Sequence, residues 1–522
     1  MRIIDMFDRS ASFYPSKDCF IEVATGARYT YGEALAASHK IGGGLVDLGV
    51  EAGETKIAVY SPNAAVTALS ILGIHRAGGI YIPVNPLSSL PDNVYVINTF
   101  GAEILMYHPD YEESVREIRK QCPNIRAAVV VRGEAPANTV ALDDWLTGPD
   151  REVPEIPEDR NAITTIFSTG GTTGRPKGAM HTHAVWEGIA FNMNLILPAR
   201  KPPVHLIAAP LTHAAGAMML SLFLPGATQV ILKKFSATGV LDAIEKYRAT
   251  HLFLPPTALY AALAEERVLE RDYSSLEYLI YGAAPSSTEK VAEAIRVFGP
   301  VLAQGYGQVE AGPAFGTILT PQDHTDAIAN GGARLASCGR RTPLAKLKIV
   351  NDDTGEELGP NQRGMIAFGG EFQMREYYQD PEQTAAVRHD GWIWTGDIGY
   401  TDEEGFVFIV DRKKEMIISG GFNVFPGEVE QAIFTHPAVQ DCAVVGVPDE
   451  KWGEAVKAVV QLKAGQSVTE SEIIDVCKDR LGSVMAPKTV DFWDELPRSP
   501  VGKVLRRAVR DTYWEGRTRA IV

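Results

Sequence analysis

The chain lacks an excess of positive charge, a paired set of cysteines and any long apolar run. Its 50 Lys and Arg residues are outnumbered by 65 Asp and Glu residues, which gives a formal net charge of −15. Without a basic field to offset phosphate repulsion, nucleic acid is excluded as a general partner. A polyanionic ligand must therefore be held in a local pocket.

The cysteines and the apolar segments exclude further classes of protein. The five cysteines are scattered and odd in number, without a C-x-x-C pair, so neither a disulfide framework nor a zinc site is expected. A reducing cytosol fits this usage. No stretch reaches the ~18–20 uninterrupted apolar residues of a membrane span. The start, M-R-I-I-D-M-F-D-R-S, lacks the features of a signal peptide, so we expect a cytoplasmic protein.

The length of 522 residues predicts two to four domains. A helix is expected from Tyr31 and another over 65–77. Strands are expected at 56–60, 80–84, 103–107, 127–131, 162–167, 204–208, 228–232, 251–254 and 278–281. This alternation predicts an α/β fold of stacked layers with largely parallel sheets.

The pattern changes twice towards the C-terminus. From about residue 345, short strands and turns predict a smaller β-rich subdomain. The charged segment 411–415 then separates two apolar runs. The final unit of roughly 105 residues is long enough for a small domain. It is expected to be a mobile α+β lid, with helices over 427–435 and 468–481 and strands over 442–447, 456–462 and 488–493.

The most informative stretch is S-T-G-G-T-T-G-R-P-K-G at 168–178. Glycines allow tight turns that point N–H groups into a concavity, hydroxyls add donors, and Lys177 adds a positive charge, which together suit phosphate oxygens. The spacing is not that of a Walker loop, because Gly178 follows the lysine where a Mg²⁺-binding hydroxyl would stand. A flexible surface loop is the alternative.

Two glycine-containing segments could frame a nucleotide. In Q-G-Y-G-Q-V-E (304–310), glycines flank Tyr306 and let the backbone approach a ligand, while Glu310 is a hard oxygen ligand suited to Mg²⁺. In Y-G-A-A-P (281–285), small side chains could leave a slot for a planar base. Ordinary turns are the alternative for both segments.

Four single residues are further candidates. Asp397 in T-G-D could accept from both ribose hydroxyls, although T-G-D is also an ordinary turn. Arg412 in the charged segment could reach ribose or phosphate oxygens, or belong to a solvated linker. Lys503, on a proline-bounded loop of the lid, could be inserted into a site, although most lysines are merely solvated. His213 follows a strand among small residues, where a histidine is more often structural.

Together and in this order, these segments resemble the acyl-adenylate-forming superfamily, which includes acyl-CoA synthetases, adenylation domains and firefly luciferases. The resemblance runs from about residue 10 to about residue 510. The run I-S-G-G-F-N-V-F-P-G-E-V-E at 418–430 looks most like the acyl-CoA synthetase branch. The resemblance implies that a carboxylate attacks the α-phosphorus of ATP to give acyl-AMP and pyrophosphate. The C-terminal domain then rotates, and the CoA thiol displaces AMP.

The resemblance also implies roles for residues. Glu310 binds Mg²⁺, Asp397 and Arg412 hold the ribose, and Lys503 bridges the carboxylate and the α-phosphate. His213 gates the acyl pocket, Lys414 is the hinge, and Gly420 and Gly421 line the pantetheine path. The β- and γ-phosphates are held by Thr169, Gly170, Gly171, Thr172, Thr173, Gly174 and Lys177. The rest of the nucleotide is framed by Gly282, Ala283, Ala284, Gln304, Gly305, Tyr306 and Val309. The implied units are residues 1–411, a hinge at 412–414 and a lid at 415–522.

One departure from the family concerns Val309. The family usually carries a threonine there, whose hydroxyl touches the α-phosphate, and a valine cannot donate that hydrogen bond of about 1–3 kcal/mol. Gly170 is a milder change, since many relatives carry serine.

We therefore expect an ATP- and Mg²⁺-dependent carboxylic acid:CoA ligase whose partners are small molecules. The acid pocket, placed by analogy, is small and apolar without Lys or Arg, which favours a fatty, aryl or alicyclic monocarboxylate. Its expected walls are Ala214, Ala215, Met218, Met219, Pro256, Thr257, Ala283, Ala284 and Gly307. The alternatives are an adenylating enzyme that loads a separate carrier protein and a non-catalytic nucleotide- or acyl-binding relative. The sequence predicts no oligomeric state.

Overall fold

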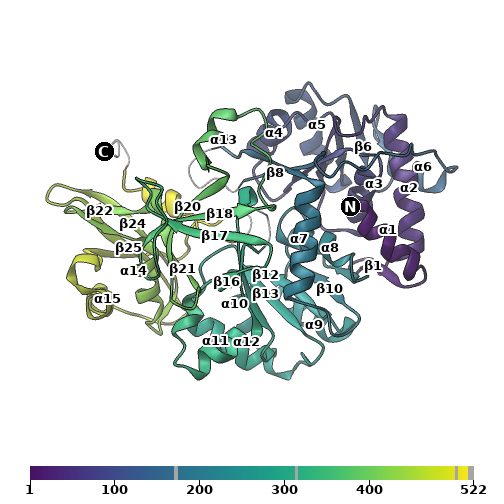
Figure 1. Cartoon of the computed structure of the whole chain (residues 1–522). Helices are drawn as coiled ribbons and strands as arrows, with labels where there is room; N and C mark the ends of the chain where they lie inside the picture. Colours follow the sequence, from purple (N-terminus) through teal and green to yellow (C-terminus); the bar gives the residue numbers. More distant parts are fainter. Residues whose placement is uncertain (170–174, 312–314, 500–501, 503, 515–522) are drawn as a thin grey trace.

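The computed structural model describes residues 1–169, 175–311, 315–499, 502 and 504–514. Within these residues the strands form four sheets, of nine, seven, five and five strands. Figure 1 shows the first six helices at one end of the molecule and the C-terminal elements α14 (Pro426–Phe434), α15 (Glu470–Met485), β24 (Val439–Asp449) and β25 (Gly453–Leu462) at the other. The chain thus runs from one end of an elongated molecule to the other.

The two largest sheets have parallel centres and antiparallel edges. In the nine-stranded sheet the six central strands, β14, β13, β12, β10, β11 and β1, pair in parallel. Strand β2 at one edge and strands β15 and β16 at the other pair antiparallel. Its order is β16 (Arg340–Arg341), β15 (Thr317–Leu319), β14 (Leu302–Tyr306), β13 (Tyr278–Gly282), β12 (His251–Leu254), β10 (Val204–Ile207), β11 (Thr228–Ile231), β1 (Asp18–Glu22) and β2 (Arg28–Thr30).

The seven-stranded sheet is parallel except for its last pair, β8 with β9. Its order is β7 (Val140–Ala141), β6 (Ala127–Val130), β5 (Ile104–Tyr107), β3 (Lys56–Tyr60), β4 (Ile80–Val84), β8 (Ile163–Ser168) and β9 (Gly178–Thr182). Parallel strands require crossover connections, and the helices between them supply these.

Helices fill the space between the two sheets and cover their outer faces. Helices α3 and α8 are buried along nearly their whole length, and one core cluster joins them and α7 to strands of both sheets. Helices α9, α10 and α11 cover one outer face, and α4 and α5 the other. These helices are α1 (Ile3–Phe13), α2 (Tyr31–Asp47), α3 (Ala65–Arg76), α4 (Leu90–Thr99), α5 (Glu112–Gln121), α6 (Leu142–Thr147), α7 (His183–Ile196), α8 (Ala214–Leu222), α9 (Ala237–Tyr247), α10 (Pro256–Leu263), α11 (Thr288–Phe298), α12 (Pro321–Ala329) and α13 (Pro381–Val387).

The alternation of apolar and helical patterns predicted this architecture well. The strands expected at 56–60, 80–84 and 251–254 match β3, β4 and β12 at both ends, and the helix expected from Tyr31 begins there. Thr30 caps that helix, since its side chain accepts from the backbone of Glu33 and Glu33 bonds back to Thr30. The expected fold class is confirmed.

A polar row crosses the middle of the nine-stranded sheet. Gln229, His205, His251 and Tyr278 are partners in register on neighbouring strands, and all four are buried. The Nδ1 atoms of His205 and His251 have hydrogen-bond partners, whereas both Nε2 atoms have none in the described structure. Burial lowers the pKa of His205 to about 4 and, together with the neighbouring His205, lowers that of His251 to about 3. Both imidazoles are therefore neutral near pH 7.

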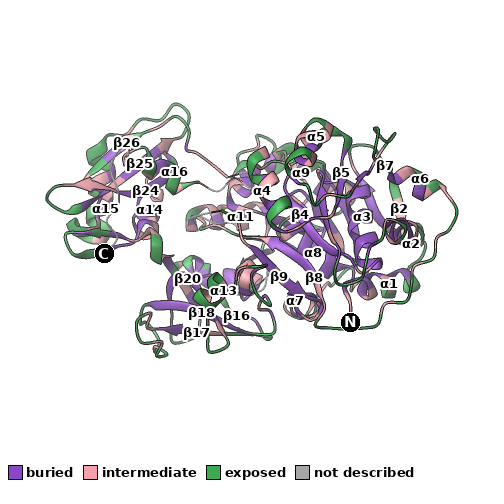
Figure 2. Cartoon of the chain, turned by 90° about the horizontal axis from the view of Figure 1, so that it is seen from above, coloured by how far each residue is buried: buried purple, intermediate pink, exposed green. Residues whose placement is uncertain are grey.

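Two smaller sheets follow along the chain. The first contains β17 (Ala345–Val350), β18 (Gly364–Gly370), β20 (Trp392–Thr401), β19 (Arg388–His389) and β21 (Val407–Arg412). The second contains β23 (Phe422–Val424), β22 (Ile417–Ser419), β25, β24 and β26 (Thr489–Phe492). We call residues 415–514 the lid where they are described. Figure 2 shows its elements α14, α15, α16 (Arg506–Asp511), β24, β25 and β26 grouped apart from the body.

Helix α15 is interrupted at Gly482, whose φ of +79° is non-helical, so its first part ends at residue 481, as predicted. Among the residues that the structure describes, no helix combines the length and the apolarity that a membrane span requires.

Candidate active site

The carboxyl ends of β13 and β14 bring two of the predicted nucleotide segments together. Gly282 and Gly305 are partners in register, and a Cβ on Gly282 would lie 2.3 Å from the carbonyl oxygen of Gly305. The next residue, Ala283, is exposed and has a left-handed backbone with φ of +67°, which alanine adopts at a cost. Such a backbone strain at the edge of a parallel sheet is typical of a binding site. Ala284 and Gln304 lie beside it, both partly exposed.

Asp397 is the centre of a buried hydrogen-bond cluster. Its Oδ2 accepts from Tyr306 Oη at 2.8 Å and from Gln308 Nε2 at 2.7 Å, and its Oδ1 lies 3.0 Å from Arg412 Nε. Asp397 is 4% exposed. Burial, reinforced by the carboxylate, raises the pKa of Tyr306 well above its usual range, so the tyrosine stays a donor. The cluster joins β14, β20 and β21, whose site residues Tyr306, Asp397 and Arg412 were predicted from separate motifs.

The T-G-D segment is part of a strand, so its interpretation as an ordinary turn was wrong. Residues 395–397 lie inside β20, where the pairing register with β18 shifts between Met365 and Ala367. Gly396 has a left-handed φ of +78° at this irregularity. An extra residue bends a strand and re-aims its side chains, which here sets Asp397 against Arg412, its partner in register on β21.

A second group joins Glu310, Tyr377 and Lys177. Tyr377 Oη donates to Glu310 Oε1 at 2.7 Å, and Lys177 Nζ lies 4.8 Å from the centre of the Tyr377 ring. Lys177 Nζ also donates to Gln383 Oε1 at 2.8 Å. Burial, followed by the Glu310 charge, raises the pKa of Tyr377, which keeps its hydroxyl protonated. One aromatic ring thus positions a cation and a carboxylate that the sequence places far apart.

The base of the predicted phosphate loop is closed by hydrogen bonds. The backbone N–H of Thr169 donates to the carbonyl oxygen of Lys177 at 2.9 Å, and the N–H of Lys177 donates to Thr169 Oγ1 at 3.3 Å. The residues between them that were predicted to bind phosphate, Gly170, Gly171, Thr172, Thr173 and Gly174, lie outside the described residues, as does Lys503.

Val309 packs its side chain against two apolar core clusters. Its carbonyl oxygen lies 2.7 Å from Nε2 of buried His181, and burial lowers the pKa of that histidine to about 4. The backbone of residue 309 is therefore fixed by a neutral imidazole, whatever its side chain.

His213 lies farther from its strand than expected. Strand β10 ends at Ile207, and His213 is instead the residue before α8, with an exposed side chain whose Nδ1 lies 2.8 Å from Thr212 Oγ1. The expected pocket residues Ala215, Met218 and Met219 follow it on α8 and are buried in the main core cluster.

The lid carries the remaining candidates. Gly420 and Gly421 form the turn between β22 and β23, with φ of +59° and +83°. A Cβ on Gly420 would come within 2.4 Å of the Trp452 ring, whereas one on Gly421 would meet nothing within 4 Å. Lys414 lies in a short 3-10 turn over Lys413–Glu415 and is exposed.

A buried charge cluster, which we call the Arg506 cluster, surrounds this turn. Arg506 contacts Asp411 at 2.8 Å and also pairs with Glu415 and Glu430. Asp411 Oδ2 accepts from the backbone N–H of Gly427 at 2.5 Å. Burial lowers the pKa of Arg506, but the three carboxylates outweigh burial and raise it well above its usual range. One guanidinium therefore binds both sides of the 412–414 segment.

The donor set fits a magnesium ion that arrives with phosphates. No group of three or more His, Cys, Asp or Glu residues that could hold a metal occurs in the described part of the chain. Glu310 offers hard carboxylate oxygens, one of them oriented by Tyr377. Mg²⁺ commonly takes one or two carboxylates and completes its shell with waters and phosphate oxygens. Glu310 would hold it.

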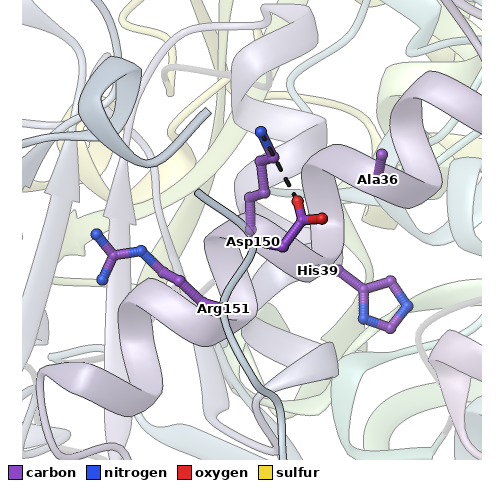
Figure 3. Close-up of a pocket in the computed structure, with 5 residues that line it drawn as sticks. Ala36, His39, Asp150 and Arg151 are labelled. Atoms are coloured by element: carbon purple, nitrogen blue, oxygen red, sulfur yellow. Dashed lines mark ion pairs between the residues drawn. The ribbon is translucent and has the colours of Figure 1, made fainter. Parts of the chain in front are cut away.

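A separate surface pocket lies on α2 and brings none of these residues together. It is lined by Ala36, His39, Lys40, Asp150 and Arg151. Figure 3 shows His39 and Arg151 pointing away from each other and Asp150 in an ion pair with Lys40. Lys40 Nζ also donates to two carbonyl oxygens of the 146–148 segment, at 3.0 Å each. Lys40 therefore holds the 146–148 segment against α2.

Comparison with known proteins agrees with this geometry. A family model described as AMP-binding enzyme matches residues 7–378, and one for the AMP-binding enzyme C-terminal domain matches residues 428–503. The chain belongs to the AMP-binding enzyme family. The acyl-adenylate-forming superfamily expected from the sequence is thereby confirmed, in its CoA ligase branch. The protein is an ATP-dependent, AMP-forming ligase.

Three relatives of this AMP-binding enzyme illustrate the likeness. The medium/long-chain-fatty-acid–CoA ligase FadD8 of Mycobacterium tuberculosis is 37% identical over 87% of this chain and 80% of its own length. A feruloyl-CoA synthase of an Amycolatopsis species is 33% identical over 94% of both chains. The amide bond synthetase McbA of Marinactinospora thermotolerans has a TM-score of 0.87 at 28% identity and covers 98% of this chain and 100% of its own.

Three residues of the site were missed by the sequence analysis. Gln308 was within a quoted motif without a role, and no local pattern distinguishes Tyr377 or Gln383. Their contacts join segments that are distant in sequence, so periodicity and spacing do not indicate them.

Proposed function

We propose that this protein joins an apolar monocarboxylic acid to CoA through an acyl-adenylate, with release of pyrophosphate and AMP. The observation that carries the proposal is the continuous set of contacts from β13 and β14 through Asp397 to Arg412. Relatives named as a fatty-acid–CoA ligase and a feruloyl-CoA synthase support CoA as the acceptor of the acyl group.

The roles proposed for the residues follow from where charge develops. Attack on the α-phosphorus concentrates negative charge on phosphoryl oxygens, so cations and donors must already be in place. Lys177 and the 169–174 segment would hold the β- and γ-phosphates, Glu310 the Mg²⁺, and Asp397 and Arg412 the ribose. Lys503 would bridge the acid and the α-phosphate. Among the described residues, Asp397 Oδ2 accepts two hydrogen bonds and Oδ1 contacts Arg412, so a further acceptor site on Oδ1 would take a ribose hydroxyl.

The division into a body at 1–411, a hinge at 412–414 and a lid at 415–522 is part of the proposal. It is supported by the change of sheet at these residues, since β21 ends at Arg412 and β22 begins at Ile417. The exposed turn between them would take up the rotation that admits CoA past Gly420 and Gly421.

The apolar acid is supported by the character of α8. The helix contains no charged residue, and its buried Ala215, Met218 and Met219 follow the exposed His213. The second carboxylate of a dicarboxylic acid would have no cation on this helix to pair with. His213 would stand between the acid and the nucleotide.

A panel of fatty, aryl and alicyclic acids, assayed for pyrophosphate and for CoA-dependent AMP release, tests the proposal. We expect both products with at least one apolar monocarboxylate and none with malonate. Pyrophosphate release without thioester formation from free CoA would instead favour the loading of a carrier protein. No pyrophosphate with any acid would favour a non-catalytic relative.

A further inference from the structure

The lid carries a loop over 497–505, of which residues 500, 501 and 503 lie outside the described part of the chain. Its base is an antiparallel bridge between Arg498 and Val504, and the N–H of Leu505 donates to the carbonyl oxygen of Pro497 at 2.8 Å. Near its tip, the N–H of Gly502 donates to the carbonyl oxygen of Ser499 at 2.8 Å. The carbonyl oxygen of Gly502 accepts from Arg498 Nη1 at 3.2 Å.

Arg498 ties this loop to the lid rather than to the body. Its Nη2 donates to Asp441 Oδ2 at 2.6 Å, on β24. The guanidinium therefore connects the backbone of Gly502 to β24, the last strand in the order of the lid sheet. A displacement of the loop tip would accordingly be transmitted to the whole lid.

Gly502 meets the body at Thr257. A Cβ built on Gly502 would lie 2.5 Å from Thr257 Oγ1 and 3.4 Å from Thr257 Cβ. A real Cβ does not approach an oxygen that closely, so with Thr257 in this rotamer the backbone comes this close only as glycine. Its φ of +82° is also a conformation that glycine adopts at no steric cost.

Thr257 lies at the edge of the sheet where the site is built. It is the second residue of α10, which begins two residues after β12 ends at Leu254. Strand β12 is the parallel neighbour of β13, which ends in Gly282 before the strained Ala283. The carboxyl ends of neighbouring parallel strands meet at one edge, so the loop tip touches the edge that holds the nucleotide segments.

We propose that Thr257 is the seat of the lid in the first half-reaction, and that Gly502 is a positioning residue because only glycine fits against it. The inference rests on the proposed function, in which the residue after Gly502 acts on the α-phosphate. Contact of this one backbone with Thr257 sets the depth to which the lid loop enters the site. The second half-reaction, with the lid rotated away, does not use the contact.

Gly502→Ala tests the seat, with Gly465→Ala as its matched control. Gly465 is also in the lid and left-handed, with φ of +74°, but a Cβ there would meet nothing within 4 Å. Since a misplacement of about 1 Å can cost about 100-fold in rate, we expect acyl-AMP formation to fall about 100-fold in Gly502→Ala. Thioester formation from supplied acyl-AMP should change less than threefold. Gly465→Ala should change neither.

Substitutions at Thr257 separate the contact from a general effect on folding. Thr257→Ala removes the Oγ1 atom and leaves an ordinary 3.4 Å contact, so Gly502→Ala combined with it should recover acyl-AMP formation to within fivefold of Thr257→Ala alone. Thr257→Val keeps the branched shape and should rescue nothing. Equal rescue by both, or rescue by neither, would overturn the proposal.

Tryptic cleavage at Arg412, Lys413 and Lys414 provides a readout that does not depend on catalysis. Lys413 and Lys414 are already exposed, and a lid that does not rest on Thr257 should make their turn more mobile, so we expect cleavage at least threefold faster in Gly502→Ala than in wild type or Gly465→Ala. Identical cleavage rates in all three would contradict the seat. Absence of pyrophosphate release by the wild type would contradict the proposed function, while this cleavage comparison would still decide the inference.

Discussion

The body and the lid hold the site in opposite ways. In the body, Asp397 is buried and is already bonded by Tyr306, Gln308 and Arg412. At the lid tip, the described contact is a glycine backbone against one threonine. The Asp397 cluster of the body is thus assembled before a ligand arrives. The lid contacts the body at Thr257 through the backbone of Gly502, which has no side chain that must lose water or a hydrogen-bond partner. A surface that must engage and release in each cycle gains from such a contact.

The hinge is a third case, because its own lysines are exposed while the charges of the Arg506 cluster beside it are buried. The Arg506 cluster binds Asp411 on one side of the 412–414 turn and Glu415 on the other. Burying a guanidinium requires partners of opposite charge, and removing one partner leaves the others uncompensated. The predictions below test whether buried charge, rather than the lid contact, carries the stability.

The largest effect is expected from Arg506→Ala. This change leaves three carboxylates facing each other without a cation, and we expect the free energy of unfolding of the lid to fall by about 3–5 kcal/mol. Urea unfolding followed by Trp452 and Trp493 fluorescence measures it. Arg507→Ala is the control, because Arg507 is 56% exposed and its ion pair among the described residues is with Asp511, four residues on in the same helix. Similar losses in the two variants would contradict a special role for the cluster.

The next effect concerns Asp397→Ala, which removes the acceptor shared by Tyr306 and Gln308. Two buried donors lose their partner at about 1–3 kcal/mol each, so we expect kcat/KM for ATP to fall about 100-fold. ATP–pyrophosphate exchange measures it. Asp353→Ala, on an exposed turn, should leave the exchange unchanged. A fall of less than fivefold in Asp397→Ala would mean that the body is not preassembled around this carboxylate.

The polar row of the large sheet predicts a pH dependence of stability. Burial and His205 lower the pKa of His251 from its usual 6.5 to about 3. Between these values the unfolded chain binds the proton and the folded chain does not, so stability is full above pH 6.5 and falls as the pH drops. At pH 5 the loss is about 2 kcal/mol for one such histidine.

His251→Leu should remove that part of the acid sensitivity. Thr250, its hydrogen-bond partner, keeps its bonds to Val204. The urea midpoint should therefore fall less between pH 7 and pH 5 in His251→Leu than in wild type, while His389→Gln, an exposed histidine, should follow the wild type. An unchanged pH dependence would show that the row lies outside the part of the chain that unfolds first.

The smallest effect is expected from Val309→Thr. The added hydroxyl can donate to the α-phosphate, and the backbone of residue 309 stays fixed by His181. We expect the rate of acyl-AMP formation to be preserved or raised by up to about tenfold. Val309→Ala, which adds no donor, should not raise it. A large fall in Val309→Thr would show that the apolar contacts of the valine are needed.

Much of the fold could be predicted because its signals are local. Apolar runs with β-branched residues marked β3 and β4, the apolar run 252–254 marked β12, and the change of pattern near residue 345 marked the first strand of the smaller sheet, β17. The bulge in β20 could not be predicted, because T-G-D has the composition of a turn and only pairing with β18 makes it a strand.

The site was predictable in its motifs but not in its connections. Asp397 and Arg412 were both expected at the ribose, and the structure makes them register partners. Tyr377 acts through contacts between segments that are remote along the chain, so no spacing rule identifies it. Thr257 was expected only as a wall of the acid pocket, and its contact with Gly502 of the lid was not predicted. Lys503 and residues 170–174 lie outside the described residues, and their roles remain predictions.

The Arg506 cluster also decides where the polypeptide can be cut. A C-terminal fragment that begins at residue 415 would retain Glu415 and Glu430 but would lose Asp411, together with its bond to the first turn of α14. Expression of the isolated module should therefore begin upstream of Asp411, even though that residue belongs to a strand of the preceding sheet.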